Sequence, residues 1–333
     1  MSTVRYDVVG LGHAIVDVIA RAEEDFLIGH GMHKGAMALI DEPRAEAIYA
    51  QMGPAIEISG GSAANTIVGV ASYGARAAFI GKVKDDGLGR AFAHDIRAAG
   101  VAYVTPFAAA GPSTGRCYIL VTPDGERTMN TYLGAAQHLA PGDVDAEVIA
   151  AGAITYLEGY LWDPHNAKQA FRRAAELAHR AGRLVALSLS DAFCVDRWRD
   201  EFRDLVVGGT VDVLFANEAE LKSLYQTADF ATAAAALRQE ARLAVVTRGE
   251  NGCVVVSPGG LEPVPAVPVE RVVDTTGAGD LFAAGFLVGL ARGATHADAA
   301  RLGALAAAEV VGHLGARPET SLKRFAGQHG LPA

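Results

Sequence analysis

The heptapeptide Asp274-Thr275-Thr276-Gly277-Ala278-Gly279-Asp280 (DTTGAGD, residues 274–280) precedes the apolar run LFAAGFLVGLARG. This run is apolar on almost every side, which predicts a buried helix, and Gly293 follows its C-terminus. The valine-rich segment PVPAVPVERVV lies upstream and predicts short strands. We therefore expect DTTGAGD to form a turn from a strand into a helix.

This turn has the composition of an anion-binding site with a base beside it. Gly277 and Gly279 flank Ala278, so successive backbone N–H groups can converge at the positive end of the helix dipole. The carboxylate of Asp280 would stand next to those amides and could remove a proton from a hydroxyl while negative charge develops nearby. The pattern suggests phosphoryl transfer to an alcohol. The alternative is a glycine-rich helix start that Asp280 caps.

The composition limits the class of protein. The chain has 333 residues, of which 50% are hydrophobic and 20% charged, and this fits a globular protein with one large α/β domain or two smaller ones. The net charge of −9 and the lack of a basic run argue against nucleic acid as a partner. A nucleotide would need a local positive field, which helix N-termini and a metal ion could supply.

The cysteines and the termini suggest a location in the cell. Cys117, Cys194 and Cys253 are far apart and lack metal-binding spacing, which fits a reducing cytoplasm. The N-terminus resembles no signal peptide, and no apolar stretch reaches the length of a membrane span. We expect a cytoplasmic protein, either a monomer or a homodimer, that contacts no membrane.

Two segments in the first third of the chain suggest a place where a ligand can bind. Asp17 is the only charge in AIVDVIA, so it must be paired or must bind a ligand such as vicinal sugar hydroxyls. The alternative is an edge strand with a solvated face. Further on, Gly60 and Gly61 open a helix and allow close approach of a ligand or of another backbone, and Asn65 would point inward. This second pattern also fits a tight helix start.

A strand followed by Gly10-Leu11-Gly12 raises the possibility of a dinucleotide-binding fold. The fingerprint of that fold needs a third small residue at position 15, where the chain has Ile15. A nicotinamide-dependent oxidoreductase is therefore a weak alternative.

Residues 101–133 are rich in β-branched and aromatic residues around a turn at 123–125, which predicts a hairpin. The hairpin could pair with strands near 14–20 and 33–40 to form a small sheet that covers a site as a lid. The alternative is an antiparallel edge of the main sheet. The expected division is a core of residues 1–13, 42–101 and 134–333 and a discontinuous lid of residues 14–41 and 102–133.

From residue 150 onward, apolar strands alternate with helical segments, which predicts a mostly parallel, doubly wound sheet. Ligands bind such sheets at the carboxyl ends of the strands. Asn217 and Glu220 follow one strand and could hold a hydrated Mg²⁺ and phosphate oxygens, although the pair also fits a helix cap. Thr247, Arg248 and Gly249 follow the next strand. They could contact a nucleotide or form a surface turn.

These motifs together resemble the PfkB (ribokinase-like) family of carbohydrate and nucleoside kinases. DTTGAGDLFAAGFL matches the C-terminal signature of that family throughout, whereas no Walker A sequence occurs. GGSAAN with GKVKDDGLG resembles the N-terminal signature and departs from it at Ile67 and Lys84. The resemblance extends from Gly10 to about Arg317.

The resemblance implies a three-layer α/β/α core with a small β lid, and it implies ATP and Mg²⁺ as cofactors. It implies that Asp280 is the catalytic base and that residues 277–279 form the anion hole. It also implies that Asp17, Gly61 and Asn65 hold acceptor hydroxyls. For the nucleotide it implies Asn217, Glu220 (to Mg²⁺ through water), Arg248 and Gly249, and for a monovalent cation such as K⁺ it implies Asp274 and Thr276.

Several segments resemble the bacterial adenosine kinase branch: HKGAMALID, PDGERTMNTYLGAA, EGYLWDP and GARP. The lid residues Met37, Phe107, Tyr118 and Met129 would suit a purine, or equally the packing of the lid on the core. We expect ATP-dependent phosphorylation of a primary 5′-type hydroxyl, with adenosine converted to AMP. The alternatives are a sugar kinase for ribose, fructose or 2-keto-3-deoxygluconate, and a catalytically silent nucleoside-binding protein.

Overall fold

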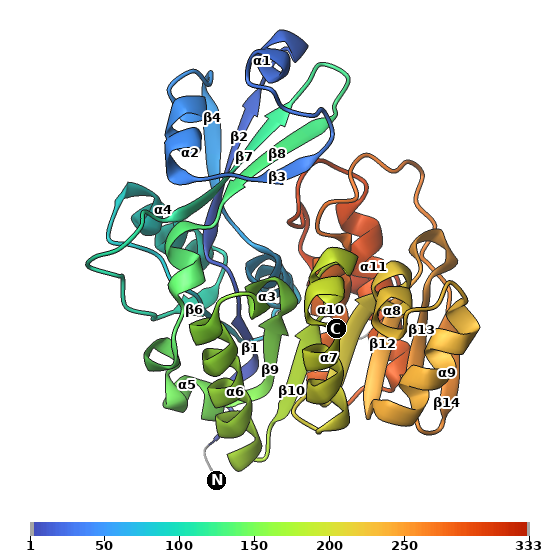
Figure 1. Ribbon diagram of the computed structural model, residues 1–333. Coiled ribbons are helices and arrows are strands. Elements are labelled where there is room, and N and C mark those ends of the chain that lie inside the picture. Colours follow the sequence, from blue (N-terminus) through green and yellow to red (C-terminus); the bar gives the residue numbers. More distant parts are fainter. Residues whose placement is uncertain (1–2, 332–333) are drawn as a thin grey trace.

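The computed structural model describes residues 3–331, which form a large sheet and a small one (Figure 1). The large sheet contains β1 (Tyr6–Leu11), β5 (Ala77–Ile80), β6 (Val101–Tyr103), β9 (Gly152–Glu158), β10 (Leu184–Ser188), β11 (Val213–Asn217), β12 (Leu243–Thr247), β13 (Cys253–Ser257) and β14 (Gly260–Val264). Their order in space is β14-β13-β12-β11-β10-β9-β1-β5-β6. All neighbours from β12 to β6 are parallel, and β13 and β14 are antiparallel. The predicted mostly parallel sheet is confirmed.

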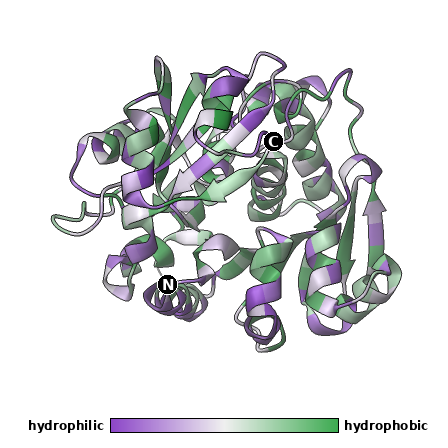
Figure 2. Cartoon of the chain, turned by 45° about the horizontal axis from the view of Figure 1, so that its top comes forward, coloured by the Kyte–Doolittle hydropathy of each residue, from purple (hydrophilic) through white to green (hydrophobic). Residues whose placement is uncertain are grey.

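Helices cover both faces of this sheet and complete the three layers. One face carries α3 (Ser62–Ser72), α4 (Gly87–Ala98), α10 (Ala278–Ala291), α11 (His296–Val310) and α12 (Leu322–Gln328). The other face carries α5 (Ala146–Ala150), α6 (His165–Arg180), α7 (Ala192–Val207), α8 (Glu218–Tyr225) and α9 (Phe230–Glu240). Successive strand residues enter different layers, because side chains alternate along a strand: Val8 packs in one hydrophobic cluster and Val9 in the other. In Figure 2 the helices accordingly alternate between hydrophobic and hydrophilic stretches.

The small sheet lies above the large one in Figure 1 and forms the lid. It contains β2 (Ile15–Arg21), β3 (Met37–Leu39), β4 (Ala55–Gly60), β7 (Gly115–Val121) and β8 (Arg127–Tyr132), in the order β3-β8-β7-β2-β4. The helices α1 (Glu24–Gly29) and α2 (Glu42–Tyr49) connect its strands. The predicted hairpin is β7 and β8, which are antiparallel, and it pairs with β2 and β3 as expected.

The strand pairing differs from the expected division of the chain at two places. Strand β4 pairs with β2 in the lid, although residues 42–101 were assigned to the core. Strand β6 pairs with β5 in the core, although the lid was expected to begin at residue 102. Strand β6 has only three residues, and half of the six residues of β4 are exposed, so neither strand carries a clear hydrophobic pattern.

The turn at residues 274–280 also differs from expectation. Residues 265–273 form no strand, so a loop rather than a strand leads into α10. Pro265 and Pro268 lie in this loop, and proline cannot donate a hydrogen bond to a sheet. The predicted helix after the turn is present as α10, and Gly293 follows it with a left-handed φ of 75°.

The chain crosses between core and lid four times, at residues 12–14, 61, 104–114 and 133. The carboxyl ends of β1, β9, β10, β11 and β12 face the lid, because these strands are parallel (Figure 1). Residues that follow these strands are therefore brought together under the lid. Within residues 3–331, no helix combines the length and the hydropathy that crossing a bilayer requires.

Candidate active site

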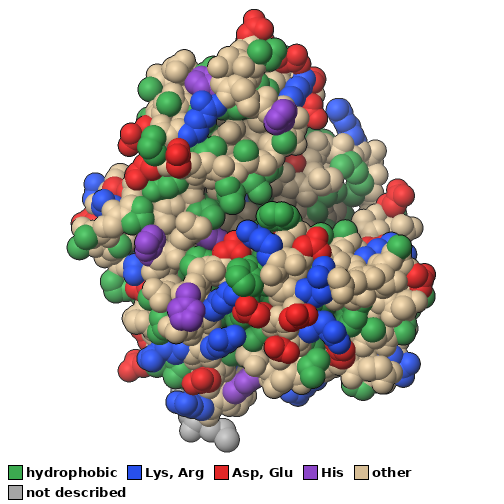
Figure 3. All heavy atoms as spheres, in the orientation of Figure 1, with side chains coloured by type: hydrophobic (Ala, Val, Ile, Leu, Met, Phe, Trp, Pro, Cys, Tyr) green, Lys and Arg blue, Asp and Glu red, His purple; other side chains and the backbone are tan. Residues whose placement is uncertain are grey.

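A cavity of about 810 Å³ lies between the lid sheet and the carboxyl ends of the core strands. Figure 3 shows the hollow between the upper and lower parts of the molecule, with charged and hydrophobic side chains at its mouth. We call its lid side the roof, which consists of Ile15, Asp17, Met37, Leu39, Cys117, Ile119, Met129 and Thr131. We call its acidic core side the floor, which consists of Glu158, Asp163, Asp191, Glu220 and Asp280.

The register of the lid sheet explains which side chains form the roof. Asp17 lies opposite Cys117, and Met129 lies between Met37 on one neighbouring strand and Ile119 on the other. Paired residues share a face of the sheet, and every second residue along each strand points to that face. Asp17 is therefore the only ionisable carboxylate on an otherwise apolar or weakly polar roof.

Four lid residues were predicted to face the acceptor, and the prediction is wrong for two of them, Tyr118 and Phe107. Met37 and Met129 line the cavity as predicted. Tyr118 is buried on the opposite face, where its ring stacks on Tyr49, because its neighbours Cys117 and Ile119 occupy the roof. Phe107 lies in a crossing segment and packs against the core.

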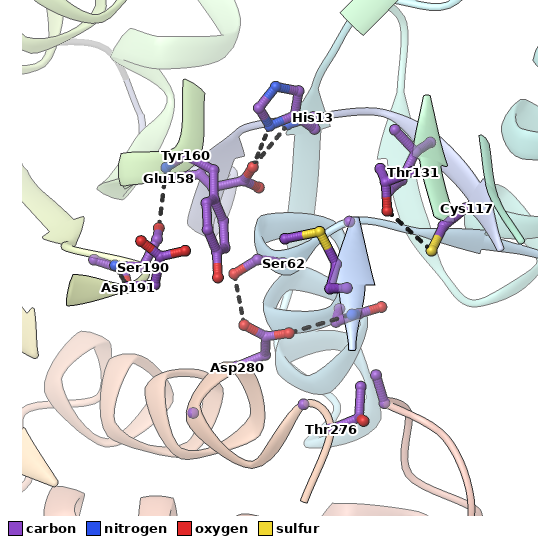
Figure 4. Close-up of a pocket in the computed structure, with 18 of the residues that line it drawn as sticks. His13, Ser62, Cys117, Thr131, Glu158, Tyr160, Ser190, Asp191, Thr276 and Asp280 are labelled. Atoms are coloured by element: carbon purple, nitrogen blue, oxygen red, sulfur yellow. Dashed lines mark hydrogen bonds and ion pairs between the residues drawn. The ribbon is translucent and has the colours of Figure 1, made fainter. Parts of the chain in front are cut away.

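Asp280 lies in the first turn of α10 and contacts the start of α3 (Figure 4). Ser62 Oγ donates to its Oδ1 at 2.6 Å, and Asn65 Nδ2 donates to its Oδ2 at 3.2 Å. Burial raises the pKa of Asp280 to about 7, the hydrogen bonds from Ser62 and Asn65 lower it, and Glu158 and Asp17 raise it further. A carboxylate with a pKa near neutral is suited to take a proton from a hydroxyl.

The backbone before Asp280 has the shape of an anion-binding turn. Gly277 has a φ of 78°, and a Cβ there would lie 2.6 Å from Ala316 Cα, so only glycine fits. The Ala278 amide donates to Thr275 O at 3.2 Å. The first amides of a helix have no partner within the helix, so those after Ala278, at Gly279 and Asp280, are the ones open to an anion.

Two glycines that the sequence analysis singled out, Gly60 and Gly61, leave room for close contacts beside Asp17. A Cβ on Gly60 would lie 2.5 Å from the carboxylate of Asp17, and a Cβ on Gly61, which has a φ of 104°, would lie 2.3 Å from His13 O. Burial raises the pKa of Asp17 to about 6, and the positive charges of Arg317 and Arg127 act against that rise. Gly61 lines the cavity, whereas Gly60 makes room for Asp17.

Arg317 is a site residue that the motifs did not indicate. Its Nε donates to Asn65 Oδ1 at 3.2 Å, and its Nη1 lies 3.3 Å from Asp95 Oδ2. Asn65 is thereby fixed with its amide nitrogen toward Asp280. The only signal in the sequence was the GARP segment, which was noted solely as a family likeness.

His13 and Glu158 form a second arrangement at the site, and no sequence motif pointed to His13 or to this pairing. His13 Nδ1 lies 2.6 Å from Glu158 Oε1, and the Ala63 amide donates to Glu158 Oε2 at 2.8 Å (Figure 4). Both side chains are buried. Glu158 therefore ties the end of β9 to the first turn of α3, which carries Ser62 and Asn65.

Asn217 and Glu220 form a reciprocal cap at the start of α8. The Asn217 side chain accepts from the Glu220 amide at 2.9 Å, and Glu220 accepts from the Asn217 amide at 2.9 Å and from its Nδ2 at 2.6 Å. Burial raises the pKa of Glu220 to about 7. Among residues 3–331 no Lys or Arg pairs with Glu220, and no three acidic, His or Cys side chains form a metal cage. A buried carboxylate without a cation fits a hydrated Mg²⁺.

Residues 247–249, which were predicted to contact the nucleotide, lie only partly at the cavity. Thr247 lines it, whereas Arg248 and Gly249 do not. Arg248 Nε donates to Glu218 Oε2 at 2.8 Å, and its guanidinium lies 4.0 Å from the centre of the Phe230 ring. Gly249 begins a short 3₁₀ helix, Gly249–Asn251.

Asp274 and Thr276, the residues predicted for a monovalent cation, lie at the end of the loop before α10. Asp274 Oδ1 accepts from the Thr276 amide at 2.9 Å. Its Oδ2 accepts from the Gly315 amide at 2.9 Å and lies 3.0 Å from Nη1 of Arg127, which comes from the lid. A guanidinium thus already pairs with this carboxylate.

Known proteins are similar to this chain in sequence and in fold. Residues 55–322 match the pfkB family of carbohydrate kinases. The chain is 53% identical to adenosine kinase from Sinorhizobium meliloti, with a TM-score of 0.90 over 98% of this chain and 99% of that one. It is 51% identical to a probable sugar kinase from Rhizobium etli, with a TM-score of 0.92 over 99% and 100%. It is 29% identical to fructokinase-1 of Oryza sativa subsp. japonica over 76% of this chain and 80% of the relative.

The family match covers most of the chain, and the two solved structures share its fold over nearly its full length. The two solved structures and the plant relative named above are all described as kinases. The chain therefore belongs to the PfkB family and is a phosphotransferase with an alcohol group as acceptor.

Proposed function

We propose that this protein is an ATP-dependent kinase that phosphorylates the primary 5′-hydroxyl of a nucleoside, with adenosine converted to AMP. The observation that carries the proposal is the roof. Its methionine and aliphatic side chains offer a broad apolar surface for a purine, with Asp17 placed among them for ribose hydroxyls. The name of the relative from Sinorhizobium meliloti, adenosine kinase, supports the same acceptor.

In the proposed reaction, Asp17, Gly61 and Asn65 bind and orient the acceptor. Asp280 accepts the proton of the attacking hydroxyl as the oxygen approaches the γ-phosphorus. Backbone amides in the first turn of α10 stabilise the negative charge on the transferred group. Positioning and electrostatics carry most of the rate in such a transfer, and the roof keeps water away from the reacting groups.

The nucleotide would lie along the ends of β11 and β12, near Asn217 and Thr247, with Arg248 and Gly249 at its outer edge. Glu220 would hold Mg²⁺ through water, and the ion would supply positive charge to the phosphates.

For K⁺ we retain Asp274 and Thr276 as the candidate residues. Because Arg127 already places a positive charge beside Asp274, we expect K⁺ to stimulate the reaction weakly. Rates in potassium chloride and in tetramethylammonium chloride test this expectation, and an absolute requirement for K⁺ would contradict it.

A sugar kinase is the second candidate, and the relatives named fructokinase and probable sugar kinase favour it. Ribose, fructose or 2-keto-3-deoxygluconate would use the same base and the same anion site. In that case the roof methionines would serve mainly to pack the lid on the core.

The experiment is ADP release with ATP and Mg²⁺ across adenosine, other nucleosides, ribose, fructose and 2-keto-3-deoxygluconate, with each phosphorylated product identified by mass. We expect strong turnover of adenosine to AMP and little turnover of free sugars. Strong turnover of a sugar alone would overturn the nucleoside assignment and would leave the phosphotransferase assignment intact.

A further inference from the structure

The floor of the cavity is acidic, although the proposed substrate is a polyanion. Five carboxylates line it, and a triphosphate would approach them closely. Within residues 3–331, the lining contains one Lys or Arg side chain, that of Arg197. Like charges repel strongly in a partly closed site, so a single cation there has a large influence on the binding of phosphate groups.

Arg197 lines the cavity, and the contacts that hold its side chain at the rim are partly exposed to solvent. Its Nη2 lies 2.8 Å from Asp163 Oδ2, and the two side chains are 39% and 29% exposed. Its guanidinium lies 4.7 Å from the centre of the Phe193 ring, which is itself largely exposed. An ion pair exposed to this degree is weak, so a phosphate can compete for the guanidinium.

The topology places this side chain between the two halves of the site. Strand β10 lies between β9, which ends at Glu158 beside the acceptor residues, and β11, which ends at Asn217 on the nucleotide side. Helix α7 follows β10 and carries Arg197 in its second turn. The phosphoryl group must pass from the nucleotide side to the acceptor side, and it therefore passes the end of β10.

The backbone around Arg197 is irregular on both sides. Ser190 has a φ of 74°, which is uncommon for a residue other than glycine, and Trp198 interrupts the helical geometry of α7 with a φ of −126°. Asp163 also accepts a hydrogen bond from Trp198 Nε1. Irregular backbone of this kind concentrates at ligand-binding segments. The turn from Asp191 to Arg197 is thus set apart from the rest of α7.

We propose that Arg197 exchanges its ion pair with Asp163 for the terminal phosphate of bound ATP and so positions the phosphoryl group for transfer. This inference rests on the proposed kinase function. Its anion is the γ-phosphate of a nucleoside triphosphate, and Asp163 is the residue that holds the guanidinium when no nucleotide is bound. Planar, bidentate recognition of phosphate is characteristic of arginine.

The test compares the dissociation constants of AMP-PNP, a non-hydrolysable ATP analogue, and of ADP, both with Mg²⁺ and without acceptor. For Arg197→Gln we expect about 10-fold or greater weakening for AMP-PNP, the range of a charge-assisted hydrogen bond, and a smaller change for ADP. Equal weakening for both nucleotides would overturn the assignment to the terminal phosphate. Unchanged binding of AMP-PNP would overturn the proposal altogether.

Arg203→Gln is the matched control. Arg203 is on the same helix, is 42% exposed, pairs with Glu240 and lies over the ring of Tyr225, but it does not line the cavity. We expect it to bind AMP-PNP as the wild type does. Equal losses in the two variants would assign the effect to α7 as a whole and would overturn the role of Arg197.

Asp163→Asn tests the same exchange by removing the carboxylate that pairs with Arg197. The amide keeps an oxygen for Trp198 and removes the charge that competes for Arg197, so we expect tighter binding of AMP-PNP. Weaker binding would contradict the exchange. If the wild type bound neither AMP-PNP nor ADP, the kinase function itself would fail; if it bound both and Arg197→Gln had no effect, only this inference would fail.

Discussion

The roof and the floor of the cavity face each other, yet they differ in chemistry. The roof offers methionine, isoleucine, leucine and cysteine side chains and one carboxylate, that of Asp17. The floor offers five carboxylates, and the guanidinium of Arg197 lies at the rim beside them. An apolar surface distinguishes acceptors by shape, whereas a charged one acts on the group that is transferred. The difference separates selection of the acceptor from phosphoryl transfer, and substitutions on the two sides should therefore change different kinetic constants.

The largest effect is expected on the floor, at Asp280. Replacing Asp280 with Asn removes the proton acceptor and should lower kcat by about 100- to 10,000-fold, while AMP-PNP binding stays near normal. Steady-state kinetics and calorimetry measure the two quantities. Asp298→Asn, a change in a half-exposed side chain in the first turn of α11, is the control. Turnover near that of the wild type would remove Asp280 from the role of base.

The same substitution should also make the fold more stable. The pKa of Asp280 is raised from 3.8 to about 7 in the folded protein, so the folded state binds more protons than the unfolded state between these values. Ionisation of Asp280 therefore costs stability as the pH rises toward 7, and Asn removes that cost. We expect a higher Tm for Asp280→Asn at pH 8 and little difference at pH 4.

The next largest effect is expected at Asp17, the charged residue of the roof, and it should change KM for the acceptor. Asp17→Asn should raise KM for the acceptor by about 10- to 100-fold, because hydrogen bonds from hydroxyls to a carboxylate become weaker bonds to an amide. KM for ATP should change little. Glu57→Gln, an exposed change on β4 in the same sheet, is the control. An equal rise in KM for ATP would show that roof and floor are not separate in function.

The apolar part of the roof should give a smaller and more selective effect. Met37→Ser should raise KM for adenosine by about 3- to 10-fold, since it removes apolar contact with a purine. KM for any free sugar that reacts should stay the same. Met37 is 50% exposed, so the fold should tolerate the change, and Ile56→Ser, at 65% exposure on β4, is the control. Equal effects on both acceptors would assign Met37 to packing.

The smallest effect is expected at Ser62, because this residue changes the pKa of Asp280 without taking part in proton transfer. The rate should fall as the pH drops below about 7, because Asp280 becomes protonated. The hydrogen bond from Ser62 lowers the pKa of Asp280, so Ser62→Ala should move this acid limb to higher pH. Ser72→Ala, at the other end of α3, should leave it in place. A shift to lower pH would contradict the arrangement.

Two of the predicted parts of the site have partners that lie close together in the chain. Asn217 and Glu220 cap one another across three residues, and Gly277 makes a turn beside Asp280. The site residues that sequence reasoning missed depend on distant contacts: Arg317 reaches Asn65, and Arg127 reaches Asp274 from the lid. Nothing local marks such an arginine as different from a solvated one.

The roof shows a second limit of sequence reasoning. The pattern of residues 117–121 predicts a strand, but an apolar or aromatic residue at each of these five positions does not reveal which alternate set faces the site. Tyr118 was expected to face the acceptor, whereas the register with β2 and β8 turns Cys117 and Ile119 inward instead. Pairing between strands, rather than propensity, fixes that choice.

The four crossings between core and lid have a consequence for folding. Ile15 pairs with Gly115 in parallel, and the chain between them builds α3, β5, α4 and β6 of the core. Such a long-range pairing has a high cost in loop entropy until the intervening segment is folded. We therefore expect the lid to acquire its structure after the core and to be unable to fold as an excised fragment. Amide protons of the lid should then exchange faster than those of the central core strands, and a destabilised core should loosen the lid with it.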